Sequence, residues 1–159
     1  MLKISKLTDY GAVIMAWLAR EPERLRSATE VAEATRIAAP TVSKILKMLA
    51  AQQLVISVRG AHGGYRLARA PAAISVADVI CAMEGPVSLT TCSGGACEQE
   101  PHCNMAGHWQ LINQAISEAL AGLTLADLLQ AAPTRSAQSA VRVHMQPSQS
   151  LPPSAPTSL

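Results

Sequence analysis

The feature that most constrains this chain is a change of hydrophobic period near residue 54. Before it, in residues 42–49, apolar side chains recur at the spacing of one face of an α-helix. After it, in residues 54–58, Leu54, Ile56 and Val58 alternate with Val55 and Ser57, a period of two that is typical of a β-strand. A glycine-rich stretch and a return strand at 65–67 follow. The chain is therefore expected to fold as helices that lead directly into a long-looped β-hairpin.

Local signals mark where the helices begin and end. Ser27 and Glu30 have the spacing of a capping box, in which each side chain bonds the backbone of the other residue. Pro40 is a residue favoured in the first turn of a helix. The expected helices are one at about 8–20 that Pro22 stops, a second opening at Ser27, a third opening near Pro40, a fourth from Ser75 to Gly85, a long one at about 105–123, and a short one capped by Thr124 and Asp127.

These elements predict a mainly α-helical fold with a small β-hairpin: a winged helix-turn-helix followed by a long dimerisation helix. The expected divisions are a DNA-binding domain at 1–83, a cysteine loop at 84–104, the dimerisation helix with a short last helix at 105–130, and a disordered tail at 131–159. The long helix carries an apolar seam that suits packing against the same helix of a second subunit. The seam consists of Trp109, Ile112, Ile116, Ala119 and Leu123.

Charge is distributed unevenly along the chain. Residues 1–70 hold eleven basic and five acidic side chains, a net charge of +6, whereas residues 71–130 hold six acidic and no basic ones. A basic half suits a polyanion such as duplex DNA. Helix three would enter the major groove, and the hairpin would be the wing that lies over the DNA backbone or minor groove. The predicted DNA-binding set is Pro40, Thr41, Ser43, Lys44, Lys47, Arg59, His62 and Gly63.

Other classes of protein are disfavoured by the sequence. The longest apolar run, residues 12–19, is too short to span a bilayer, and the first residues do not have the form of a signal peptide, so a cytoplasmic protein is expected. Neither a C-x-x-C pair nor a glycine-rich cofactor loop is present, so no enzyme activity and no catalytic residue are predicted.

Three cysteines, Cys92, Cys97 and Cys103, are spaced C-x4-C-x5-C in the glycine-bearing loop between helices. Thiolates are soft ligands, so the loop is predicted to hold an iron–sulfur cluster or a zinc ion, with disulfide chemistry third. Cys81 lies in an apolar helix and is predicted to be a buried free thiol. His102 and His108 flank the third cysteine as fourth-ligand candidates, with surface histidines as the alternative.

Three segments together resemble the Rrf-two family of winged-helix transcriptional regulators. They are the wing at 58–67 (VRGAHGGYRL), the opening at 2–10 (LKISKLTDY) and the three-cysteine loop. The resemblance covers about residues 1–130. It is to the IscR-, NsrR- and RirA-like members, and the overall pattern is most similar to regulators of the Suf iron–sulfur assembly system.

This resemblance implies a homodimer with crossed long helices and a DNA affinity that depends on an iron–sulfur cluster, [2Fe-2S] or [4Fe-4S], held by Cys92, Cys97 and Cys103. Two departures bear on the ligands. The first cysteine gap is one residue shorter than usual in IscR and NsrR, and Ala106 stands where IscR-like members place a histidine. NsrR-like members draw a carboxylate from helix one of the other subunit, and Asp9 matches it. His108 and an exogenous ligand are alternatives.

The function expected from the sequence is a cluster-dependent transcriptional repressor of iron–sulfur assembly (Suf) genes. The alternatives are a nitric-oxide- or iron-responsive repressor of the same family and a DNA-binding regulator with structural zinc.

Overall fold

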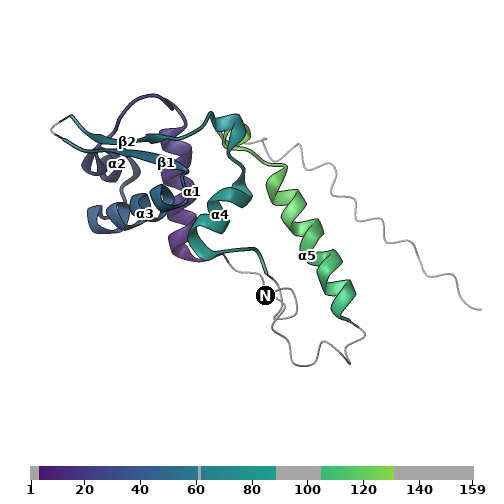
Figure 1. Ribbon diagram of the computed structural model, residues 1–159. Helices are drawn as coiled ribbons and strands as arrows, with labels where there is room; N and C mark the ends of the chain where they lie inside the picture. The colour runs from purple at the N-terminus through teal and green to yellow at the C-terminus, as the bar shows by residue number, and fades with distance from the viewer. Residues whose placement is uncertain (1–3, 61, 89–104, 131–159) are drawn as a thin grey trace, which may run out of the picture.

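The computed structural model describes residues 4–60, 62–88 and 105–130. Three helices, α1 (Lys6–Leu18), α2 (Ala28–Thr35) and α3 (Ala39–Ala51), precede an antiparallel hairpin of β1 (Val55–Val58) and β2 (Gly64–Leu67). A short 3-10 helix η1 (Pro71–Ala73) then leads to α4 (Val76–Glu84), α5 (Ala106–Ala121) and α6 (Leu125–Leu129). Figure 1 shows α2, α3 and the hairpin on one side of α1, with α4 and α5 on the other. The predicted mainly α-helical winged helix-turn-helix is confirmed.

Side-chain caps start most of these helices. Capping boxes are formed at α2 by Ser27, at α4 by Ser75 and at α6 by Thr124, as the sequence predicts. Helix α1 begins two residues earlier than expected, because the Ser5 hydroxyl accepts a hydrogen bond from the amide of Thr8. Helix α3 has no side-chain cap and carries its proline in the first turn.

One apolar core joins the helices to the base of the hairpin. The inner face of α3 is fully buried, and it packs against α1 and α2. Helix α6 returns to this core: Leu125 is fully buried, and its amide donates to the carbonyl oxygen of Ile74 at 2.9 Å. The amide of Val76 donates in turn to the carbonyl oxygen of Leu123 at 2.8 Å. The start of α4 and the start of α6 are therefore fixed to each other.

The prediction that Cys81 is buried is wrong, because its side chain is exposed. Helix α4 turns its inner face through Val79 and Met83, and a residue two positions from Val79 lies about 200° around the helix. The hairpin differs from a simple alternation as well. Leu54 and Val55 are both buried, whereas Ile56 and Val58 are exposed.

None of the helices in the described parts of the chain is both long enough and apolar enough to span a membrane.

Candidate nucleic-acid interface and cysteine segment

Helix α3 separates its apolar and polar side chains on opposite faces. Its buried residues are Val42, Ile45, Leu46 and Leu49. The residues predicted to read DNA lie away from that core: Pro40, Lys44 and Lys47 are exposed, and Thr41 and Ser43 are half-buried. The face that remains open is therefore polar and basic, as a helix that enters the major groove requires.

The wing is a hairpin whose tip depends on glycine. In its register Val55 lies opposite Leu67 and Val58 lies opposite Gly64. Gly60 adopts a φ of +116°, and its carbonyl oxygen accepts from the amide of Gly63 at 3.0 Å. A Cβ on Gly63 would lie 2.2 Å from the carbonyl oxygen of Val58, so only glycine fits there. Gly63 therefore has a packing role in the wing, in addition to the DNA approach predicted for it.

The base of the wing is closed by the segment before α2. The backbone of Arg26 exchanges two hydrogen bonds with Tyr65, at 2.9 and 2.8 Å, and so adds a bridge to the edge of β2. The Arg26 guanidinium lies 5.0 Å from the centre of the Trp17 ring and pairs with Glu21 at 2.9 Å. Arg26 therefore has a structural role, although it belongs to the basic half of the sequence.

Ion pairing distinguishes two groups of basic residues. Arg24, Arg26, Arg66 and Arg69 each pair with an acidic side chain within 4 Å. Among the described residues, Lys44, Lys47 and Arg59 have no such partner, and all three are exposed. Arg20 and Arg36 share this property. Within the described residues, the cations of the predicted DNA-binding set therefore belong to the group without an acidic partner, together with Lys6, Arg20 and Arg36.

A second polar cluster lies where α4 ends. The amide of Ser5 donates to Glu84 Oε1 at 2.9 Å, and the hydroxyl of Thr8 donates to the same oxygen. We call these three residues the Glu84 anchor. The Thr8 hydroxyl, followed by the Ser5 amide, holds the pKa of Glu84 below its ordinary value. The anchor fixes the carboxyl end of α4 to the first turn of α1.

The cysteine segment lies just beyond this anchor. Cys92, Cys97, Cys103 and His102 lie outside the described residues, as does the predicted tail at 131–159. Before the segment, the carbonyl oxygen of Val87 accepts from Asn113 Nδ2 of α5 at 2.9 Å. The stretch that leads into the three cysteines is therefore bonded to both α1 and α5.

The predicted ligand candidates outside the cysteine loop are Asp9 and His108. Both are exposed, Asp9 in the first turn of α1 and His108 on α5. Asp9 adjoins Thr8 of the Glu84 anchor, so it lies at the end of α1 that α4 reaches. Within the described parts of the chain, no three His, Cys, Asp or Glu side chains form a metal-binding group. The ligand set therefore stays a prediction.

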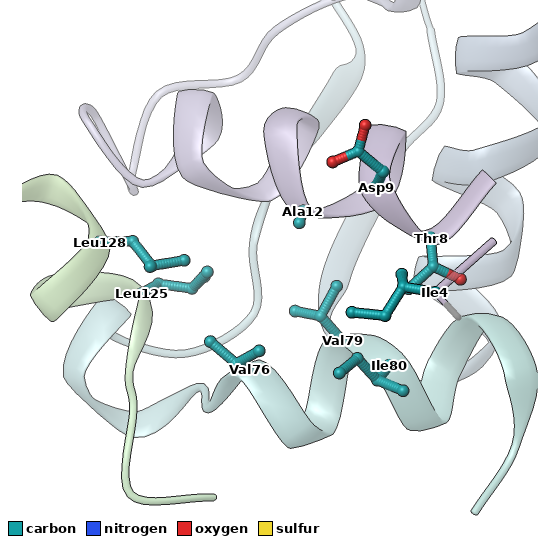
Figure 2. Close-up of a pocket in the computed structure, with 9 residues that line it drawn as sticks. All are labelled: Ile4, Thr8, Asp9, Ala12, Val76, Val79, Ile80, Leu125 and Leu128. Atoms are coloured by element: carbon teal, nitrogen blue, oxygen red, sulfur yellow. The ribbon is translucent and has the colours of Figure 1, made fainter. Parts of the chain in front are cut away.

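Asp9 also borders a small pocket of about 90 Å³ between α1, α4 and α6. Figure 2 shows the Asp9 carboxylate directed away from Val76 and Val79, while Ile4 points toward the α4 side chains. The pocket is apolar apart from its rim, so it suits an apolar side chain better than a polar ligand. Its lining residues are Ile4, Thr8, Asp9, Ala12, Val76, Val79, Ile80, Leu125 and Leu128.

Sequence reasoning missed the Glu84 anchor. The contact between Glu84 and Thr8 joins residues 76 positions apart, and no local pattern indicates it.

Comparisons with known proteins agree with this architecture. A family model described as Rrf2, iron-dependent transcriptional regulator, matches residues 4–131. CymR (YrzC), the global cysteine regulator of B. subtilis, is 34% identical, with 81% of this chain and 97% of that chain covered and a TM-score of 0.66. IscR of T. potens is 33% identical, with 80% and 86% covered and a TM-score of 0.61. CymR of Staphylococcus aureus is 27% identical, with 82% and 100% covered and a TM-score of 0.59.

The helix-turn-helix, the wing and the family match therefore agree on one class. The chain is not an enzyme but a DNA-binding regulator, and it belongs to the Rrf2 family of iron-dependent transcriptional regulators.

Proposed function

We propose that this regulator acts as a homodimer whose affinity for DNA depends on an iron–sulfur cluster, [2Fe-2S] or [4Fe-4S], and that it represses Suf iron–sulfur assembly genes. The observation that carries the proposal is the bonding of the cysteine segment's leading flank to two elements at once. Glu84 bonds Ser5 and Thr8 of α1, and Val87 bonds Asn113 of α5. The stretch that leads into the cysteines is thereby bonded to α1, the helix on which α3 packs.

The donor set fits such a cluster. Cys92, Cys97 and Cys103 would supply three thiolates, which suit iron–sulfur clusters, and the family is described as iron-dependent. We propose Asp9, from the other subunit, as the oxygen ligand, with His108 as its alternative. When bound, the cluster would supply sensitivity to oxidants, nitric oxide and iron supply.

The residues of the chain itself would convert this occupancy into DNA affinity. Glu84 holds the end of α4 against α1, and α1 packs directly on α3. The predicted DNA-binding set lies on α3 and the wing, where its cations are free to meet phosphates. A switch of this kind needs the two states to differ in DNA affinity by only a few kcal/mol.

The second subunit is supported by the surface of α5. On α5 Leu111 is 67% exposed and Ile112 42%, and Leu123, two residues beyond the end of α5, is 49% exposed. Within the described parts of the chain α5 packs mainly on α4, which leaves this apolar surface uncovered. Exposed apolar surfaces of this kind mark protein interfaces, and a two-fold partner offers the same surface in return. We therefore retain 1–83, 84–104 and 105–130 as the DNA-binding, cluster-binding and dimerisation regions.

The test is anaerobic purification followed by visible absorption and by analysis for iron, acid-labile sulfide and zinc. Gel shifts of the holo and apo forms on the promoter of the cluster-assembly operon follow. We expect iron, acid-labile sulfide and the absorption spectrum of a cluster. We also expect the gel shift to differ between the holo and apo forms. Zinc with no sulfide would favour the structural-zinc alternative. No difference between the two forms on this promoter, together with binding to other DNA that changes after nitric oxide, would favour the nitric-oxide-responsive repressor.

Two cysteine variants make the test specific to the predicted ligands. Cys97→Ala is expected to lose the cluster and the difference between the forms. Cys81→Ala is the matched control, because Cys81 is an exposed thiol on α4 outside the trio, and it should keep both. A Cys97→Ala protein with full iron and unchanged switching would refute the proposed role of the loop.

A further inference from the structure

Arg36 adopts a backbone conformation that side chains other than glycine disfavour. It is the C-cap of α2, with φ 56° and ψ 30° in the left-handed region. Glycine is the usual residue at such a position, because an L side chain is crowded there. Only Arg36 and Gln53 among the described non-glycine residues have a positive φ. An arginine at this position is therefore a costly choice that packing alone does not explain.

The residues on either side of Arg36 fix its position. The hydroxyl of Thr35 donates to the carbonyl oxygen of Val31 at 2.7 Å and closes the last turn of α2. Ile37 follows immediately and is buried in the main core. With its neighbours held on both sides, the backbone of Arg36 has little freedom, and its exposed side chain leaves the protein from the turn that precedes α3.

The charge of Arg36 has no partner within the described residues. Glu33, one helical turn earlier, is exposed but forms no ion pair with it. Lys44 and Lys47 on the following helix are likewise exposed and have no acidic partner in the described parts of the chain. By contrast, Arg69 beyond the wing pairs with Asp78 at 3.8 Å. Arg36 thus belongs with the unneutralised cations of the helix-turn-helix, not with the structural ones.

We propose that Arg36 is a further DNA-contacting residue, which binds a backbone phosphate beside the major groove that α3 enters. The inference rests on DNA binding by the helix-turn-helix and not on the cluster. The left-handed backbone fixes where the guanidinium emerges, so that the helix-turn-helix gains a phosphate contact at its turn as well as on α3. A phosphate contact positions the protein without reading sequence, and it makes binding more sensitive to salt.

The test compares Arg36→Gln and Arg36→Gly with the wild-type full chain. Binding of each protein to a mixed-sequence 30-base-pair duplex is measured by fluorescence anisotropy at several salt concentrations. Loss of one phosphate contact should reduce the slope of log K against log salt by about 0.9 per bound protomer. When salt is raised from 50 to 200 mM, the fold-loss of affinity should then be about 12 times smaller for a bound dimer of the variant than for the wild type. Arg36→Lys keeps the charge and should keep most of the slope.

Arg36→Gly separates DNA contact from folding, because glycine relieves the left-handed conformation. Its melting temperature should rise by about 2–5 °C while its DNA affinity falls. Arg69→Gln is the charge-matched control, since its partner Asp78 already neutralises it, and its salt slope should stay near that of the wild type.

Two outcomes would overturn the inference, and they are distinguishable. A wild-type slope in both Arg36→Gln and Arg36→Gly would overturn this inference alone. A wild-type chain whose binding to any duplex ignores salt would overturn DNA binding by the proposed surface as well.

Discussion

Single residues decide whether the wing can form, and Gly63 has the most crowded position of the described glycines. A Cβ there would lie 2.2 Å from the carbonyl oxygen of Val58 and 2.9 Å from the carbonyl carbon of Arg59. Gly63→Ala must therefore displace the tip, and we expect it to lower the free energy of unfolding by roughly 1–3 kcal/mol. Urea unfolding measures this. Gly107→Ala on α5 is the control, because a Cβ there meets nothing within 4 Å. Equal stability of the two variants would contradict the crowded tip.

Glu84 gives a prediction on pH. Its pKa lies below the ordinary value of 4.5, because the Thr8 hydroxyl and then the Ser5 amide bond its charged form. A depressed folded-state pKa adds stability that is present above about pH 4.5 and is lost as pH falls through the folded-state value. Glu84→Gln should therefore lower the melting temperature at pH 7 by roughly 2–4 °C. The difference from wild type should shrink between pH 5 and pH 3.

Thermal unfolding followed by circular dichroism across that pH range checks the Glu84 prediction. Glu33→Gln is the control, because Glu33 is an exposed carboxylate of α2 with no hydrogen bond to the described residues. Its melting temperature should follow the wild type at every pH. A Glu84→Gln curve that runs parallel to the wild type from pH 7 to pH 3 would show that the anchor contributes nothing through its charge.

At the scale of elements, α2 is too short to be stable without its cap and its packing. The Ser27 hydroxyl accepts from the amide of Glu30 at 3.1 Å, and the Glu30 carboxylate accepts from the amide of Ser27 at 2.7 Å. Ser27→Ala should cost about 1 kcal/mol of unfolding free energy, measured by chemical denaturation. Thr29→Ala in the same exposed turn is the matched control and should cost less. If Thr29→Ala is the more damaging change, the capping box is not what starts α2.

How far the sequence predicts each element depends on how local its cause is. The capping boxes at Ser27, Ser75 and Thr124 and the inner face of α3 were predictable, because each depends on residues within four positions. Cys81 was misplaced because an apolar helix segment does not reveal which side faces the core. The Glu84 anchor was not predictable, because tertiary packing alone brings α4 to the start of α1.

The candidate site likewise has a part that local sequence predicts and a part that it does not. The position of the α3 residues on a polar face is confirmed by the fold, since the helical period fixes it once the apolar stripe is known. Their contacts with DNA stay predictions, as do the ligands of the cluster. The left-handed backbone of Arg36 could not be foreseen, because glycine is the residue that normally signals such a turn.

At the scale of the whole molecule, α5 is bonded to the rest of the described chain near its middle and again just beyond its carboxyl end. Asn113 of α5 bonds the carbonyl oxygen of Val87 after α4, and beyond α5 the buried Leu125 returns to the common core. In the proposed dimer, a change in how two α5 helices pack is therefore expected to move the proposed DNA-binding domains with them. We therefore expect this connection to couple dimerisation to DNA affinity, so that weakening one weakens the other.

Ile112→Glu tests that coupling. Ile112 is 42% exposed on the apolar seam of α5, so a glutamate costs the isolated subunit little but places like charges at a two-fold interface. We expect the dissociation constant of the dimer to rise at least tenfold by analytical ultracentrifugation, and DNA affinity at fixed protein concentration to fall with it. Gln110→Glu adds the same charge to an exposed position on the opposite face and should leave both unchanged. Circular dichroism verifies that each variant is folded. An Ile112→Glu protein that sediments and binds DNA as the wild type does would remove α5 as the dimerisation helix, while leaving the α3 surface as the element that meets DNA.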